Sequence, residues 1–86
     1  MIVRFHKNFE KEYKKLREKE RNKFKERIRV FLRDEFDPTL NNHPLRGKYK
    51  GYRSISVTGD LRAIYKKMIK NETIFVAIDS HSNLYN

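Results

Sequence analysis

The sequence predicts an α+β fold in which an N-terminal strand and a two-helix hairpin precede a three-stranded antiparallel meander, with all strands in one sheet. Three observations lead to this prediction. Apolar residues recur at helical spacing in the first half of the chain, they follow strand patterns in the second half, and short polar turns separate the later segments. With 86 residues the chain has the size of one domain, and we expect residues 1–86 to form it.

The first forty residues predict a strand and two helices. Residues 2–5 form a short, mostly apolar run that is typical of a strand. Two stripes at helical spacing follow, one made of Phe9, Tyr13 and Leu16 and the other of Phe24, Ile28, Phe31 and Leu32. Because residues 17–23 carry no apolar side chain, we expect helices over residues 7–18 and 21–35, folded back as a hairpin. One long bent helix is the alternative. Asp37-Pro38 should end the second helix, because the residue before a proline avoids the helical conformation.

The remaining chain predicts three strands, over residues 52–58, 61–66 and 73–79. Short turns join them, so consecutive strands should be antiparallel. The last strand is the most apolar and should lie inside the sheet. We expect a loop over residues 39–50 and a polar tail over residues 80–86. The helix pair should cover one face of the sheet and leave the other partly open.

The composition favours a polyanionic partner. The chain has 21 Lys and Arg residues against 11 Asp and Glu residues, a formal net charge of +10. No apolar run approaches the ~20 residues needed to span a bilayer, and residues 1–10 lack the apolar stretch of a signal peptide, so we expect no membrane association and a cytoplasmic location. There are no cysteines, and the three histidines lack ligand spacing, so we expect no metal and no other cofactor.

A basic segment at residues 45–53 is the first candidate for nucleic-acid binding. Its cations, which could neutralise phosphates, are Arg46, Lys48, Lys50 and Arg53. Two tyrosines accompany them, and Tyr52 could stack on an unpaired base. The alternative is a basic loop that enters a strand, with its tyrosines covering the sheet edge.

Two histidines and one arginine suggest acid–base chemistry. His43 and His81 could act as a general base and a general acid, which metal-free RNA cleavage requires. Arg62 should share a strand face with Asp60 and lie across the turn from Ser56, where it could stabilise charge on a phosphate. The alternatives are that each histidine is an ordinary loop residue and that Arg62 forms a cross-strand ion pair.

The second half of the chain resembles the RelE superfamily of bacterial toxins, and its YafQ branch in particular. The similar segments are His43-Pro44-Leu45-Arg46-Gly47, Lys50-Gly51-Tyr52-Arg53, the Asp60 turn, Ile64-Tyr65-Lys66 and the final Ser80-His81-Ser82-Asn83-Leu84-Tyr85. The resemblance is specific over residues 42–86. Over residues 1–36 it consists of element order and charge alone.

The resemblance implies a ribosome-dependent, metal-independent endoribonuclease, that is, an mRNA interferase that cuts the codon in the decoding site by attack of a 2′-hydroxyl. By position, His81 would be the general acid and His43 the general base. Asp60 would orient a histidine, and Tyr85 would stack on the base at the scissile site.

In one place the sequence departs from the YafQ pattern. Ser56 stands where that branch carries a further histidine, and it would contact RNA without transferring a proton. Arg62 falls where other RelE-like toxins have a catalytic arginine, and we expect it to stabilise the transition state instead.

The resemblance also implies two partners, a cognate antitoxin and mRNA on the 70S ribosome. We expect a monomeric toxin that assembles with its antitoxin into a hetero-oligomer of a type II toxin–antitoxin system. Two alternatives stay open: a ParE-like toxin that acts on DNA gyrase without nuclease activity, and an RNA- or ribosome-binding module with activity weakened at Ser56.

Overall fold

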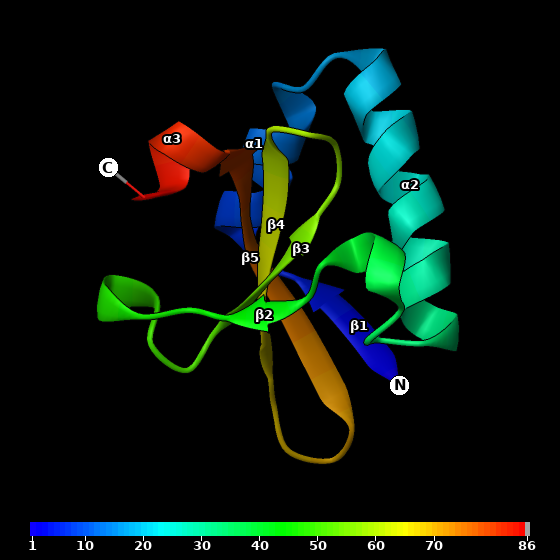
Figure 1. The fold of residues 1–86 in the computed structure, drawn as a ribbon, viewed down its shortest axis with the longest axis vertical. Coiled ribbons are helices and arrows are strands. Elements are labelled where there is room, and N and C mark those ends of the chain that lie inside the picture. Colours follow the sequence, from blue (N-terminus) through cyan, green and yellow to red (C-terminus); the bar gives the residue numbers. More distant parts are fainter. Residues whose placement is uncertain (86) are drawn as a thin grey trace.

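The computed structural model describes residues 1–85 and confirms the α+β fold (Figure 1). Its strands are β1 (Ile2–Phe5), β2 (His43–Pro44), β3 (Arg53–Ser56), β4 (Leu61–Lys67) and β5 (Glu72–Ser80). Its helices are α1 (Lys7–Lys14), α2 (Glu18–Arg33) and α3 (His81–Tyr85), and short 3-10 turns occur at η1 (Pro38–Leu40) and η2 (Gly47–Tyr49). Within residues 1–85, no helix has the length and apolar character needed to cross a membrane.

The sheet has five strands in the order β1-β5-β4-β3-β2. The predicted antiparallel meander of β3, β4 and β5 is confirmed, and β5 lies inside the sheet. The N-terminal strand β1 pairs with β5 in parallel, because the helix hairpin carries the chain back across the sheet before the meander begins. Strand β2 was expected to be part of a loop. It has only two residues, one of them proline, and so carries no alternating pattern.

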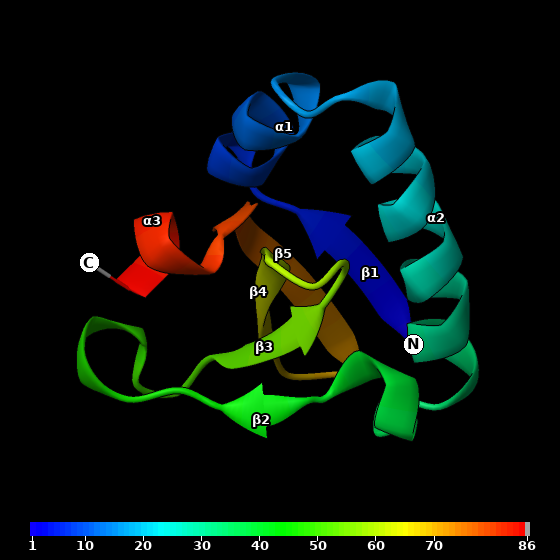
Figure 2. The same cartoon turned by 45° about the horizontal axis from the view of Figure 1, so that its top comes forward.

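The helices form a hairpin, as predicted, and the single bent helix is wrong (Figure 2). The expected boundaries were also wrong by several residues, because α1 ends at Lys14 and α2 begins at Glu18. The backbone N–H of Arg17 donates to the Glu20 carboxylate at 3.1 Å, which caps the second helix. This cap starts a new helix where the apolar stripe is interrupted.

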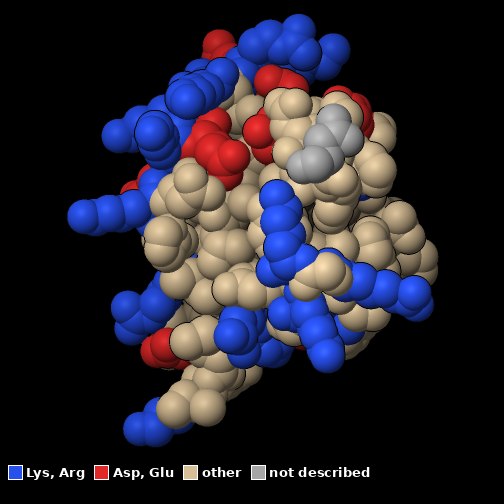
Figure 3. Space-filling view, turned by 90° about the vertical axis from the view of Figure 1, so that its left-hand side faces the viewer, with Lys and Arg blue, Asp and Glu red and all other residues tan. Residues whose placement is uncertain are grey.

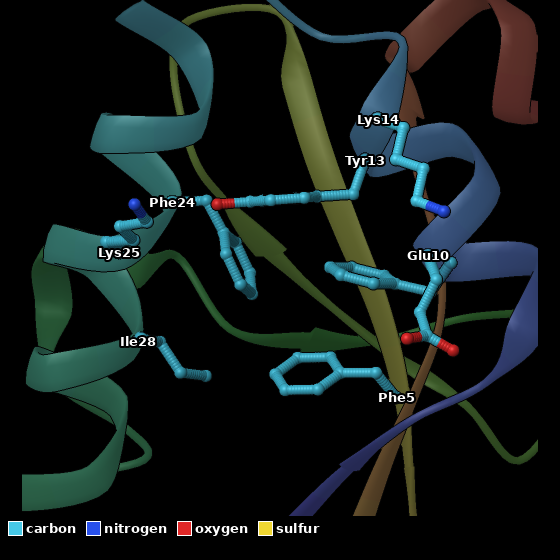
Figure 4. Close-up of a pocket in the computed structure, with 8 residues that line it drawn as sticks. Phe5, Glu10, Tyr13, Lys14, Phe24, Lys25 and Ile28 are labelled. Carbon is cyan, nitrogen blue, oxygen red and sulfur yellow. The ribbon is translucent and has the colours of Figure 1, made fainter. Parts of the chain in front are cut away.

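Aromatic rings fill the core between the helices and the sheet. Phe24 and Phe75 meet edge to face with centroids 5.8 Å apart, and Phe31 meets Tyr65 in the same way at 5.0 Å. The core reaches the surface in a hollow of about 330 Å³ between α1 and α2, where Phe5 is 42% exposed (Figure 4). This hollow lies on the helix side of the sheet, away from the predicted site residues.

The C-terminal segment is helical, where a polar tail was expected. Ser80 Oγ accepts from the backbone N–H of Asn83 at 3.2 Å and caps the first turn of α3. Leu84 is only 4% exposed and packs against Ile64 and Ala77 on the face of the sheet opposite α1 and α2. Therefore α3 and the η2 segment cover this second face in part, and we call it the open face.

Candidate active site

Four aromatic rings form a continuous line at the open face, which we call the aromatic strip: His81, Tyr85, Tyr49 and Tyr52. The ring centroids of His81 and Tyr85 are 4.7 Å apart, those of Tyr85 and Tyr49 are 6.4 Å apart, and those of Tyr49 and Tyr52 are 6.0 Å apart. The strip joins residues from the C-terminal helix, the η2 turn and the position just before β3. His81 and Tyr85 are exposed, and Tyr49 and Tyr52 are half-buried. Rings that are accessible to solvent can stack on unpaired bases.

Cations accompany the strip. The Lys48 Nζ atom lies 5.3 Å from the Tyr49 ring centre, and the Lys66 Nζ atom lies 5.4 Å from the Tyr52 ring centre. Arg46, Lys48, Tyr49 and Tyr85 help to line a hollow of about 270 Å³, which we call the first hollow. Figure 3 shows this side of the molecule, where Lys and Arg side chains border a surface that is uncharged apart from a group of Asp and Glu side chains in its upper part. A ligand with stacking bases and negative phosphates fits this arrangement.

A polar row crosses the open face beside the strip. Ser56, Arg62 and Asp79 are cross-strand neighbours on β3, β4 and β5. The Arg62 guanidinium donates to the backbone oxygens of Thr58 at 3.0 Å and Leu61 at 3.2 Å. Within residues 1–85 it forms no ion pair, so the structure does not show the ion pair considered as an alternative. The guanidinium retains donors for a phosphate.

His43 lies on β2 opposite Ser54, so its side chain belongs to the open face. Its Nδ1 atom is 2.9 Å from the backbone oxygen of Asn41, a residue with the left-handed φ of 47°. Because a carbonyl oxygen only accepts, Nδ1 must carry the hydrogen in this contact, which leaves the Nε2 lone pair free in the neutral ring. This tautomer is the one that a general base needs.

A hydrogen-bond network on the helix side anchors the residue before His43. The Asn42 amide donates to the Tyr65 hydroxyl at 2.7 Å and to the Glu35 backbone oxygen at 2.9 Å, and it accepts from Arg53 Nε at 2.7 Å. The Tyr65 hydroxyl donates to the Glu35 carboxylate at 2.7 Å, and burial together with this carboxylate raises the pKa of Tyr65. The structure thus places Arg53 in this network, with its guanidinium over the Phe36 ring, apart from the other expected RNA-binding residues.

Asp60 meets His81 through the backbone. The His81 N–H donates to the Asp60 carbonyl oxygen at 2.9 Å, which ties α3 to the β3–β4 turn. The Asp60 side chain is exposed, and no described hydrogen bond links its carboxylate to a histidine ring. Asp79 lies opposite Arg62 in the polar row, and its carboxylate accepts from Ser80 N and Asn83 Nδ2 at 2.7 and 3.1 Å.

The two histidines flank the open face without touching. His43 shares a cross-strand row with Ala77, which is three strands away, or about 14 Å between backbones. His81 follows the end of β5. The row of Ser56, Arg62 and Asp79 lies on this same face and runs from β3, next to the strand of His43, to β5, which His81 follows.

Helix α1 also brings Glu12 to the site, a residue that the sequence did not indicate. Its carboxylate accepts from Ile78 N and Asn8 Nδ2, both at 3.1 Å. Burial raises the pKa of Glu12, and the charge of Asp79 adds to this shift. Burial is the main cause of the raised pKa of Tyr49, and the negative charges of Glu12 and Asp79 raise this pKa further. Nothing local in the sequence distinguishes Glu12 from the other helical carboxylates.

A metal site is not apparent in the described part of the chain. Among residues 1–85, no three His, Asp or Glu side chains gather closely enough to hold an ion.

Comparisons with known proteins agree with this fold. The YafQ structure from E. coli strain BL21(DE3) is 23% identical and covers 98% of this chain and 97% of its own, with a TM-score of 0.81. A YoeB/ParE toxin from Agrobacterium tumefaciens is 20% identical, with coverages of 94% and 99% and a TM-score of 0.77. A chain of the E. coli DinJ-YafQ toxin-antitoxin complex is 26% identical, with coverages of 98% and 96% and a TM-score of 0.73.

A family model gives the most direct assignment. No curated protein sequence matches the chain. The model described as "Bacterial toxin of type II toxin-antitoxin system, YafQ" matches residues 1–86, the full length of the sequence. The chain therefore belongs to the YafQ family of bacterial toxins, within the RelE superfamily.

Proposed function

We propose that this toxin is a ribosome-dependent endoribonuclease that cuts mRNA without a metal. One observation carries the proposal, which is that three kinds of group share one open face. They are a histidine in the tautomer of a general base, an arginine that has no ion pair among residues 1–85, and an aromatic strip that ends in a second histidine. These groups supply the proton acceptor, the charge stabilisation and the proton donor that the reaction needs.

The reaction begins when the 2′-hydroxyl of the scissile nucleotide attacks the adjacent phosphorus. His43 Nε2 accepts the hydroxyl proton, and Arg62 stabilises the negative charge that develops on the phosphate oxygens. The bond from phosphorus to the 5′-oxygen breaks, and protonated His81 gives its proton to that oxygen. The products are a 2′,3′-cyclic phosphate and a free 5′-hydroxyl, and water can open the cycle to a 3′-phosphate.

The remaining residues bind the message. Arg46, Lys48 and Lys50 are exposed and neutralise phosphates. Tyr52 and Tyr85 stack on bases along the strip, with Tyr85 at the scissile site. Ser56 contacts the RNA beside Arg62. Asp60 holds His81 through its backbone oxygen, which replaces the side-chain orientation expected from the sequence.

Two partners follow from this proposal. The first is mRNA in the decoding site of the 70S ribosome, to which a chain with a net charge of +10 is attracted. The second is a cognate antitoxin, because a 26% identical relative has been solved in the DinJ-YafQ toxin-antitoxin complex. The toxin itself is a monomer that acts in the cytoplasm and joins its antitoxin in a hetero-oligomer.

The test uses purified toxin and ribosomes programmed with a defined message. Primer extension should map cuts at the decoding site, and a 2′-deoxy nucleotide at the scissile position should abolish them. His81→Ala and His43→Gln should each lower the single-turnover rate about 10²–10⁴-fold. Lys25→Gln, on the opposite side of the molecule, is the matched control and should cut normally. Cutting by the wild type that survives 2′-deoxy substitution would refute the mechanism.

A further inference from the structure

We infer that the toxin has a second nucleotide subsite, which holds the nucleotide adjacent to the scissile one. The site is a hollow of about 340 Å³ whose lining includes His6, Lys48, Tyr49 and Tyr52, and we call it the second hollow. The inference rests on the proposed function, and it assigns a role to His6, for which the sequence indicated none.

The two hollows adjoin. Both are lined by Lys48 and Tyr49, so this turn of the chain forms a wall between them. Tyr85 lies on one side of Tyr49 at 6.4 Å and Tyr52 lies on the other side at 6.0 Å. Successive nucleotides of a single strand share one phosphate. A cation common to two neighbouring hollows is well placed to bind that phosphate while each base lies against its own tyrosine.

His6 presents a fixed hydrogen-bond donor at the second hollow. Its Nδ1 atom accepts from the backbone N–H of Asn8 at 3.0 Å, which caps α1. The ring hydrogen must therefore be on Nε2, and this edge of the exposed side chain is free to donate. The backbone N–H of His6 donates to the Phe75 oxygen at 2.9 Å, so the backbone of His6 is anchored to the sheet, while the bond from Asn8 orients the ring.

The chemistry of the second hollow favours a single-stranded ribonucleotide. Lys48 and the His6 Nε2–H supply a charge and a donor for phosphate or sugar oxygens. Tyr52 supplies a ring for an unpaired base, and Lys66 lies 5.4 Å from the centre of that ring. The Asn8 amide is already bonded to the Val76 oxygen and to Glu12, so it is occupied.

The test compares His6→Asn with the wild type. Asparagine is a preferred N-cap residue, so this variant should keep the helix cap while it removes the Nε2–H donor. Binding is measured by fluorescence anisotropy with single-stranded oligonucleotides that carry a 2′-deoxy nucleotide at the scissile position. These are extended one nucleotide at a time on either side. In the wild type, one of the added nucleotides should increase the affinity. In His6→Asn, the gain from that nucleotide should be about fivefold smaller, and the gain from every other nucleotide should be unchanged.

Two further measurements make the result specific. Lys48→Gln should weaken binding and lower the log–log salt slope by about 0.7, as expected for one lost phosphate contact on a single strand. His6→Asn should leave the slope unchanged, because a neutral imidazole releases no counterion. Lys25→Gln is the control for net charge.

The outcomes separate this inference from the proposed function. Normal binding of every oligonucleotide by folded His6→Asn would overturn the second subsite, and so would an equal loss at every length. Either result leaves the mRNA cleavage test unaffected, because His6 takes no part in proton transfer. Absence of cutting by the wild type would instead refute the nuclease, and with it the role of this subsite.

Discussion

Ser56 and Arg62 lie directly opposite each other on β3 and β4, in the row that continues to Asp79 on β5. This chain resembles the YafQ pattern, and that pattern has a histidine at the position of Ser56. Arginine stays protonated in proteins, so Arg62 cannot replace that histidine in proton transfer. It can supply only charge and hydrogen bonds, which limits its role to stabilisation of the phosphate.

Arg62→Ala should therefore lower the single-turnover rate on programmed ribosomes by about 10²-fold, the effect of removing one charge-stabilising donor. The shape of the pH–rate profile should not change, because the proton-transfer groups are intact. Arg62→Lys keeps the charge and should recover part of the rate. A loss of less than about threefold in a folded Arg62→Ala variant would contradict this role.

Tyr65→Phe should destabilise the fold through the network that anchors Asn42. The lost hydroxyl donates to Glu35 and accepts from Asn42, both at 2.7 Å, so removing it takes one hydrogen bond from each of these half-buried residues. We expect a cost of about 1–3 kcal/mol, seen as a lower Tm in thermal unfolding. Tyr13→Phe is the matched control, since its hydroxyl makes one long bond of 3.3 Å to Arg21 O and should matter less. Equal effects of the two variants would count against the network.

Substitution of Arg46 should affect RNA binding alone, and substitution of Arg53 should affect stability alone. Arg46 is exposed beside the first hollow, whereas Arg53 lies on the helix side, bonded to Asn42. Arg46→Gln should lower the salt slope of RNA binding by about 0.7 and leave the Tm unchanged. Arg53→Gln should lower the Tm and leave the slope unchanged. A reduced slope in the Arg53 variant would restore it to the RNA-binding surface.

Regular local patterns explain what the sequence predicted of the fold. The meander and the two helices repeat a period over enough residues to be recognised. Strand β2 and helix α3 are too short for a period, and tertiary contacts stabilise them: pairing with β3 in one case and burial of Leu84 in the other. The parallel partner of β1 depends on the path of the whole chain.

The site was predictable only in part, for a similar reason. Successive side chains of a strand point to opposite faces of the sheet, so Arg53 shares the helix side with Ile55, whereas Tyr52 points to the open face. The alternating pattern of the sequence therefore already indicated that Arg53 does not lie on the open face. His43 and His81 stood out through a family resemblance. Glu12 and His6 come from the N-terminal region, where no motif marks them, and only the folded chain brings them beside the strip.

Glu12→Gln should stabilise the toxin at neutral pH and not in acid. Burial raises the pKa of Glu12, so the folded state holds the proton more tightly than the unfolded chain. The contribution of Glu12 to the free energy of unfolding therefore decreases as the pH rises from about 4 towards neutrality, and the glutamine removes this decrease. Its Oε1 atom can still accept from Ile78 N and Asn8 Nδ2. Thermal unfolding should give a higher Tm for the variant at neutral pH and equal values near pH 4. A Tm difference that is the same at both pH values would show that packing, and not the buried charge, separates the two proteins.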